Sequence, residues 1–253
     1  MTAALAFLFL GVSCGGQAGS DSQIKLGAPP GASLILVDYV AAQMNITSVA
    51  TPMLDIESFP DCCSANIQLA LSSLSIDAAL MCPDAAKALV DRDKRYIIVG
   101  ACLANSDILV VKGDPASAQK IGVSQNHLYQ TDIVNKLLGA GVATTAMSYA
   151  ALSPAYEKGE VDGVVINIEG ALLLQGTMLS AGGAKGDVVT YELVARKNLA
   201  GLERLKAAFS EASAALKDEA KLQAAIDSYG QLPDNGTEAS LWMQHNIRFL
   251  TPA

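Results

Sequence analysis

The sequence is poor in aromatic and basic residues, and each shortage excludes a class of protein. Phe, Trp and Tyr make up 5% of the 253 residues, whereas hydrophobic residues make up 51%. That balance favours alternating strands and helices over an aromatic-rich β-sandwich. The formal net charge is −8, and Lys and Arg form no cluster, so we expect no nucleic-acid partner. The acidity favours a soluble, monomeric surface.

The N-terminus carries the features of an export signal. Residues 3–12 form an apolar run of the length expected for a signal-peptide core, and too short to span a bilayer. Small residues then precede Cys14, and a flexible polar stretch follows it. This pattern resembles a bacterial lipobox, with an ordinary cleaved signal as the alternative. We predict a signal peptide and tether over residues 1–22, lipidation at Cys14 and no later membrane span.

The remaining cysteines form no metal or redox motif. They are Cys62, Cys63, Cys82 and Cys102, and no pair has the C-x-x-C spacing of a zinc or redox site. We therefore expect no metal and no cofactor. Export permits a disulfide from Cys62 or Cys63 to Cys82 or Cys102, and small buried thiols are the equal alternative.

Strand and helix patterns alternate along the chain, which predicts an α/β fold. The predicted strands are residues 23–26, 45–51, 76–81, 95–102, 107–112, 120–123, 144–148, 161–168 and 187–195. Two predicted helices end near residues 43 and 139. The other predicted helices cover residues 64–73, 85–90, 150–158, 170–179, 199–229, with a break near Lys217, and 238–250. This alternation predicts mixed, mostly parallel sheets with helices on both faces.

The last helices follow no sheet of their own, so we expect them to return and cover the first block. This makes the first lobe discontinuous. We predict lobe 1 over residues 23–105 plus 192–253 and lobe 2 over residues 106–191, joined by two crossing strands. A ligand then binds in the cleft between the lobes, at the carboxyl ends of the strands.

Three segments carry a family resemblance. They are SLSIDAALMCPDAAKALV (73–90), YEKGEVDGVVINIEGALLL (156–174) and YELVARKNLAGLERLKAAFSEASAALK (191–217). They resemble the ligand-facing junctions of both lobes and the returning strand of type 2 periplasmic binding proteins, most closely the sulfonate/nitrate/thiamine-precursor type of ABC-transporter substrate-binding protein. The resemblance spans nearly all of the mature chain and implies a two-lobed binder that docks on an ABC permease. Asn167-Ile168-Glu169 stands where that subgroup often has a Trp, which leaves the ligand open.

Candidate ligand contacts lie at strand-to-helix junctions, where free backbone N–H groups and the positive end of the helix dipole point into a cleft. The first lobe and its exit supply Pro29, Gly31, Ser33, Met81, Cys82, Asp84, Asn105 and Ser106. The polar junction 124–131 supplies Ser124, Gln125, Asn126, His127 and Thr131. By resemblance, Tyr149 and Glu169 complete the cleft. Capped turns, surface positions and a core ion pair are the structural alternatives.

The candidate loops hold almost no Lys or Arg, so we predict a neutral, zwitterionic or partly cationic ligand rather than a strong anion. The predicted function is that of a solute-binding lipoprotein of an ABC uptake transporter, tethered outside the bacterial cell membrane and closing by hinge bending. The alternative is an enzyme on the same fold, of the menaquinone-pathway type with a small carboxylate substrate. The export signal and the lack of a readable nucleophile–base pair favour the binder.

Overall fold

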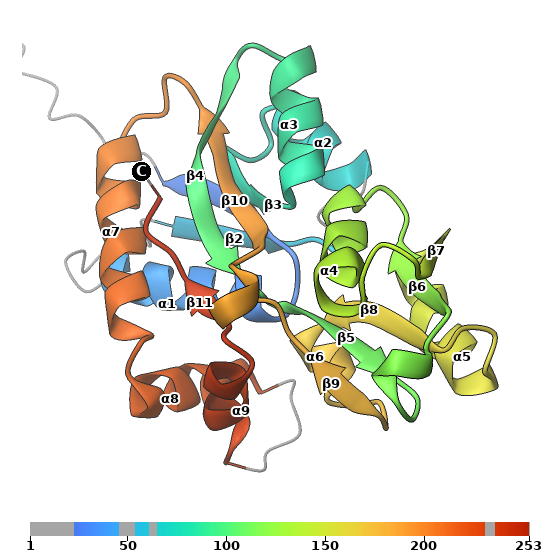
Figure 1. The fold of residues 1–253 in the computed structure, drawn as a ribbon. Helices are drawn as coiled ribbons and strands as arrows, with labels where there is room; N and C mark the ends of the chain where they lie inside the picture. Colours follow the sequence, from blue (N-terminus) through green and yellow to red (C-terminus); the bar gives the residue numbers. More distant parts are fainter. Residues whose placement is uncertain (1–22, 46–53, 61–64, 231–235, 253) are drawn as a thin grey trace, which may run out of the picture.

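Two β-sheets with flanking helices make up the computed structural model, which describes residues 23–45, 54–60, 65–230 and 236–252 (Figure 1). The predicted tether with Cys14 lies outside these ranges, as do Cys62 and Cys63 and the predicted strand residues 46–51. Within the described ranges, no helix is long and apolar enough to cross a bilayer.

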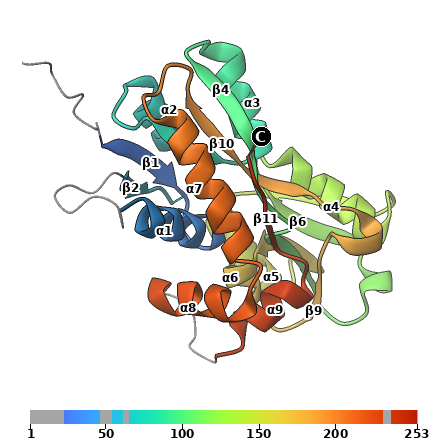
Figure 2. The same ribbon diagram turned by 90° about the vertical axis from the view of Figure 1, so that its left-hand side faces the viewer.

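The first lobe is built on a six-stranded sheet in the order β11-β4-β10-β3-β1-β2. Its strands are β1 (Ile24–Ala28), β2 (Leu54–Ser58), β3 (Ala78–Met81), β4 (Tyr96–Ala104), β10 (Val189–Arg196) and β11 (Arg248–Phe249). Its helices are α1 (Ala32–Asn45), α2 (Ala65–Ser72), α3 (Pro83–Arg92), α7 (Leu202–Ala215), α8 (Glu219–Tyr229) and α9 (Glu238–Gln244). Helix α7 packs on α1 and α8 packs on α9, while α3 packs on β4 and β10 (Figure 2). The C-terminal helices therefore return to the first lobe.

The second lobe is built on a five-stranded sheet in the order β7-β6-β8-β5-β9. Its strands are β5 (Asp107–Val111), β6 (Lys120–Ser124), β7 (Ala143–Met147), β8 (Gly163–Asn167) and β9 (Thr177–Leu179). Its helices are α4 (Leu128–Leu138), α5 (Tyr149–Lys158) and α6 (Ile168–Ala171), and short 3-10 turns cover Pro115–Ser117 and Gly183–Lys185. In Figure 1 this lobe lies beside the first, with β5 leading into it from β4.

Both sheets share one topology, but the prediction of mostly parallel sheets is wrong. In each lobe the strands run second, first, third, then one reversed strand, then a fourth, and the reversed strands are β10 and β5. Of the nine described pairings, four are parallel and five are antiparallel. The reversed strand is a crossing strand inserted into each sheet, and it makes two antiparallel contacts where a local βαβ unit makes parallel ones.

Two predicted helices are wrong in part, because short segments at their ends pair with a sheet. Helix α6 stops at Ala171, and the next predicted helical residues include β9, which pairs with β5. Helix α9 stops at Gln244, Asn246 has a φ of 56°, and β11 pairs with β4. The break near Lys217 is confirmed, since Asp218 begins α8 by accepting a hydrogen bond from the Lys221 N–H.

The chain crosses between the lobes at Asn105–Ser106 and again before β10, and hydrogen bonds tie the two crossings together. Asn105 Oδ1 accepts from the Val188 N–H at 2.8 Å. Ser106 Oγ donates to Thr190 Oγ1 at 2.8 Å. The predicted lobe boundaries stay predictions: the first falls at this crossing, whereas β10 begins three residues before the second.

Candidate functional site

A cavity of about 100 Å³ lies between the two lobes and is the candidate site. The first lobe lines it with Pro29, Pro30, Pro60 and Tyr191, and the second lobe with Asp107, His127, Gln130, Tyr149 and Asn167. These lining residues include one carboxylate and no Lys or Arg. Because both lobes contribute, a molecule held here contacts both at once.

Asp107 is the charged group of this cavity, and hydrogen bonds fix its position. It is the first residue of β5 and is only 3% exposed. Its Oδ2 accepts from Tyr129 Oη at 2.7 Å and from Gln130 Nε2 at 2.6 Å. Gln130 is fixed in turn, since its Oε1 accepts from the Ser124 N–H at 2.7 Å. Helix α4 therefore orients the carboxylate at the entrance of the chain into the second lobe.

Aromatic rings reach the cavity from both lobes. Tyr149 begins α5, is 38% exposed and donates from Oη to Asn167 Oδ1 at 2.6 Å. The His127 ring stacks on Tyr129, with the ring centroids 5.5 Å apart. Tyr191 lines the cavity from β10 of the first lobe. The site thus combines a carboxylate and amides with ring faces that bind planar or cationic groups.

Glu169 of the second lobe lies against the N-terminus of α1 in the first lobe. A Cβ added to Gly31 would lie 2.6 Å from the Glu169 carboxyl carbon, and the φ of Gly31 is 89°, so this close approach requires glycine. Both carboxylate oxygens are buried and accept no hydrogen bond of normal geometry. Burial raises the pKa of Glu169 to about 7; the backbone N–H groups of Glu169 and Ala32 lower it, and the charge of Asp107 raises it.

The other predicted residues around α1 have structural contacts. Ser33 Oγ donates to the Pro29 carbonyl oxygen at 2.7 Å, which closes the first turn of α1. The Gly31 N–H donates to Tyr229 Oη of α8 at 2.9 Å. Of the predicted residues in this junction, Pro29 alone lines the interlobe cavity.

The predicted residues at the end of β3 lie apart from this cavity. Met81 and Cys82 are fully buried in the first lobe. Cys102 is also buried, and burial raises the pKa of its thiol. Asp84 lines a separate cavity of about 420 Å³ together with Asn126, and its Oδ2 accepts from the Tyr129 N–H at 3.3 Å. That bond joins α3 of the first lobe to α4 of the second.

The structure separates the predicted residues of the crossing and of the 124–131 junction. Asn105 and Ser106 are buried in the crossing network and do not line the interlobe cavity. Ser124 is buried, and its hydroxyl oxygen has no hydrogen-bond partner among the described residues. Gln125 is exposed and Thr131 is half-buried on α4, both outside the cavity lining. His127 and Tyr149 lie in the lining.

Sequence reasoning did not single out six lining residues: Pro30, Pro60, Asp107, Gln130, Asn167 and Tyr191. Gln130 stands within the 124–131 junction, and Asn167 and Tyr191 stand within the segments that carry the family resemblance. Asp107 had a usable signal, since a charged residue there opens a strand of four fully buried aliphatic residues. Pro60 had none.

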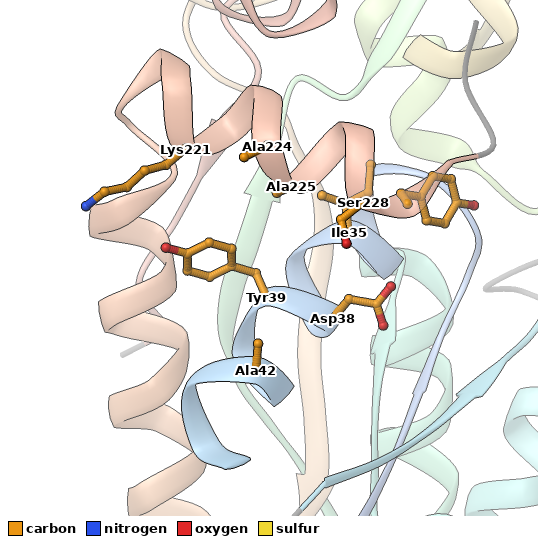
Figure 3. Close-up of a pocket in the computed structure, with 9 residues that line it drawn as sticks. Ile35, Asp38, Tyr39, Ala42, Lys221, Ala224, Ala225 and Ser228 are labelled. Atoms are coloured by element: carbon orange, nitrogen blue, oxygen red, sulfur yellow. The ribbon is translucent and has the colours of Figure 1, made fainter. Parts of the chain in front are cut away.

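A larger cavity, of about 360 Å³, lies between α1 and α8, away from the interlobe region (Figure 3). Figure 3 shows Asp38 and Tyr39 extending from α1 and Lys221 from α8. Burial raises the pKa of Asp38. Both walls belong to the first lobe, so lobe closure does not bear on this groove. Among the side chains that the structure describes, no cluster of three or more His, Cys, Asp or Glu is arranged to hold a metal ion.

Two lobes with one shared strand order and a cavity between them define the two-lobed periplasmic-binding-protein fold. No protein-family model and no curated protein sequence matches this chain. Solved structures of ABC-transporter substrate-binding proteins do match over most of its length.

Three of the similar structures show the extent of the match. The zinc-bound ligand-binding component of an ABC-type import system from Staphylococcus aureus has a TM-score of 0.69 at 14% identity, covering 91% of this chain and 86% of that one. The periplasmic aliphatic sulphonate binding protein SsuA from Escherichia coli has a TM-score of 0.65 at 18% identity, covering 89% and 84%. A nutrient binding protein from Burkholderia cenocepacia bound to methionine has a TM-score of 0.58 at 16% identity, covering 78% and 96%. At these identities the likeness shows the fold.

Proposed function

We propose that this protein is the extracytoplasmic solute-binding component of an ABC import system and captures a small organic molecule between its lobes. One observation carries the proposal: a cavity whose lining comes from both lobes, with an oriented carboxylate and aromatic residues. The similar structures include the ligand-binding component of an ABC-type import system, an aliphatic sulphonate binding protein and a nutrient binding protein bound to methionine, which supports a solute-binding role here.

The proposed mechanism is hinge closure. The lobes meet through contacts that opening breaks, such as Asp84 with the Tyr129 N–H and Glu169 against Gly31. The crossings at Asn105–Ser106 and before β10 connect the lobes and remain hydrogen bonded while the lobes rotate. A ligand that contacts both lobes shifts the population toward the closed form, which then docks on the permease.

The proposed location follows from the N-terminal sequence. A signal peptide with lipidation at Cys14 would anchor a monomer to the outer face of the cell membrane. We predict that Cys14→Ser moves the protein from the membrane fraction to the soluble fraction of the exporting host, since one lipid-modified residue carries the anchor. Immunoblots of the two fractions measure this. Equal membrane retention of the variant contradicts the anchor and leaves the binding function untouched.

A solute screen tests the binding function. The purified protein is screened by thermal shift against vitamins, their precursors, amino acids, sulfonates, amidines and oxyanions, since a ligand at 100 times its Kd adds about 2.7 kcal/mol to stability. Small-angle scattering then measures the radius of gyration of the protein with each confirmed ligand. We expect compaction, with the ligand recovered unchanged. A chemically converted ligand supports the enzyme alternative instead.

Matched variants show whether the interlobe cavity is the binding site. Gln130→Ala removes a lining residue that holds both Asp107 and the Ser124 N–H, so we expect ligand affinity to fall at least ~10-fold. Asp132→Asn changes an exposed carboxylate two residues away on α4, outside the cavity lining, and is the control. Equal binding by both variants would place the ligand elsewhere.

A further inference from the structure

We infer that the solute carries a positively charged nitrogen group, held by Asp107 against the aromatic walls of the interlobe cavity and lying within the field of the buried Glu169 carboxylate. This inference rests on the proposed function and narrows it to one ligand class. Amidinium, guanidinium and ammonium compounds belong to that class.

Asp107 is a buried carboxylate in the wall of the cavity. Its Oδ2 already accepts two hydrogen bonds, from Tyr129 Oη and Gln130 Nε2, and these fix the carboxylate in the cavity wall. Both donors are neutral groups, and no salt bridge to Asp107 occurs among the described side chains. A buried carboxylate without a cationic partner is costly, and a cation bound in the same cavity compensates it.

Glu169 is a second buried carboxylate, close to the cavity lining. Its two oxygens are buried and lack a hydrogen-bond partner of normal geometry, and the carboxylate lies against Gly31, next to Pro30 of the cavity lining. Asp107 is close enough for its charge to raise the pKa of Glu169. Tyr229 of α8 lies near this carboxylate: its Oη accepts from the Gly31 N–H, and the charges of Glu169 and of Asp38 on α1 both raise the pKa of Tyr229. Neither Tyr229 nor Asp38 is cationic. An incoming positive charge relieves the repulsion between the two acids.

The aromatic residues of the lining also favour a cation. His127, Tyr149 and Tyr191 line the cavity, and the face of an aromatic ring attracts a positive charge. The N-terminus of α1, which would otherwise attract an anionic group, is already faced by the Glu169 carboxylate. The net charge of −8 further favours the approach of cations.

An isosteric series tests the sign of the ligand charge. Benzamidine, benzamide and benzoate share one planar shape and differ in charge, as do the smaller acetamidine, acetamide and acetate. Calorimetry at pH 7 and constant chloride measures the binding of each to the intact protein. We expect the amidines to bind at least ~10-fold more tightly than the amides, and the carboxylates to bind more weakly than the amides.

Variants and buffers identify the groups responsible. Asp107→Asn should abolish the preference for the amidines, Glu169→Gln should reduce it, and Asp132→Asn should preserve it. Amidine binding should also release protons at pH 7, seen as a heat that depends on the buffer's ionisation enthalpy, and Glu169→Gln should lose this release. Circular dichroism checks that each variant is folded.

Three results overturn the inference: equal or tighter binding of the carboxylates, no preference within either series, or an amidine preference that survives in Asp107→Asn. If the broad solute screen yields an anionic ligand, the inference fails while the solute-binding function stands. If no solute in that screen binds, the function itself fails.

Discussion

The crossing between the lobes and the cleft beside it differ in how completely their buried polar groups are hydrogen bonded. At the crossing, Asn105 makes three side-chain hydrogen bonds, to Asp187, Val188 and Asn246. Beside the cleft, both oxygens of Glu169 and the hydroxyl oxygen of Ser124 lack a hydrogen bond of normal geometry among the described residues, and neither residue lines the interlobe cavity. Folded proteins rarely leave buried polar groups unpaired. The side chain of Asn105 at the crossing is therefore fully hydrogen bonded, whereas the buried groups of Glu169 and Ser124 beside the cleft are left without hydrogen bonds of normal geometry.

The largest expected effect comes from removing the hydrogen bonds of Asn105 at the crossing between the lobes. Asn105→Ala removes three hydrogen bonds and leaves the buried Val188 N–H unpaired, at a backbone φ of 61° that asparagine tolerates better than alanine. We expect a loss of about 4 kcal/mol in the free energy of unfolding, from about 1 kcal/mol per bond and the backbone cost. Urea denaturation at pH 7 measures it.

Asn126→Ala is the matched control for that variant. Asn126 has a similar φ of 66° but is exposed, so the backbone cost of about 1 kcal/mol should dominate. Equal losses in the two variants would mean that the buried network adds nothing, and the contrast between crossing and cleft would not hold for stability.

The second prediction concerns the buried carboxyl group of Glu169. Burial raises the pKa of Glu169 from 4.5 to about 7, so the folded state binds more protons than the unfolded state between these values. The stabilisation is therefore complete below pH 4.5 and is lost as the pH rises toward and through 7. The difference corresponds to at most about 3 kcal/mol. Glu169→Gln cannot ionise, so its stability relative to the native protein should rise over this range.

Urea denaturation of both proteins at several pH values between 4 and 8.5 gives this difference directly. Other carboxyl groups titrate in both proteins, and the subtraction removes their contribution. A Glu160→Gln control changes an exposed carboxyl of the second lobe and should leave the pH profile unchanged. A constant difference between the native protein and Glu169→Gln would show that Glu169 is solvated and that the cleft is open in solution.

The contrast between the two regions also explains what the sequence could predict. Alternating apolar patterns found most helices and strands, because each depends on residues close in the chain. They missed β9 and β11, of three and two residues, because these exist only through pairing with β5 and β4 far away in the sequence. They also missed β2, since the strand predicted over 45–51 ends before Leu54, and Asn45 is the last residue of α1.

Prediction of the site from the sequence has the same limit. Reasoning from strand-to-helix junctions placed Pro29 and His127 among the candidates, the family resemblance added Tyr149, and all three line the cavity. The candidates included Asn105 and left out Asp107, because only the fold shows that Asn105 is fully paired while Asp107 lies in the cavity wall. Polarity is visible in a sequence, but the number of partners that a buried group finds depends on the packed lobes.

A third prediction tests the contact that Gly31 of the first lobe makes with Glu169 of the second. Gly31→Ala places a methyl group where the Glu169 carboxyl lies and forces alanine into a φ of 89°. We expect a loss of about 2 kcal/mol in the free energy of unfolding, shared between backbone strain and the displaced carboxylate. In the Gly31→Ala/Glu169→Ala double variant the second part disappears, so a coupling energy of about 1 kcal/mol should remain in the cycle. Strict additivity would mean that the two lobes do not meet there.

The smallest effect should come from Ser106 in the crossing, because its hydroxyl can be removed while its partner Thr190 keeps another hydrogen bond. Ser106 Oγ donates to Thr190 Oγ1, and Thr190 Oγ1 itself donates to the Leu103 carbonyl oxygen at 3.2 Å. Ser106→Ala leaves that second bond intact, so we expect a loss of about 1 kcal/mol or less. Thr190→Val removes the acceptor of one bond and the donor of the other, and leaves the buried Ser106 hydroxyl unpaired, so it should cost more. Urea denaturation that ranks Ser106→Ala above Thr190→Val in cost would contradict the direction of donation along this chain of hydroxyls.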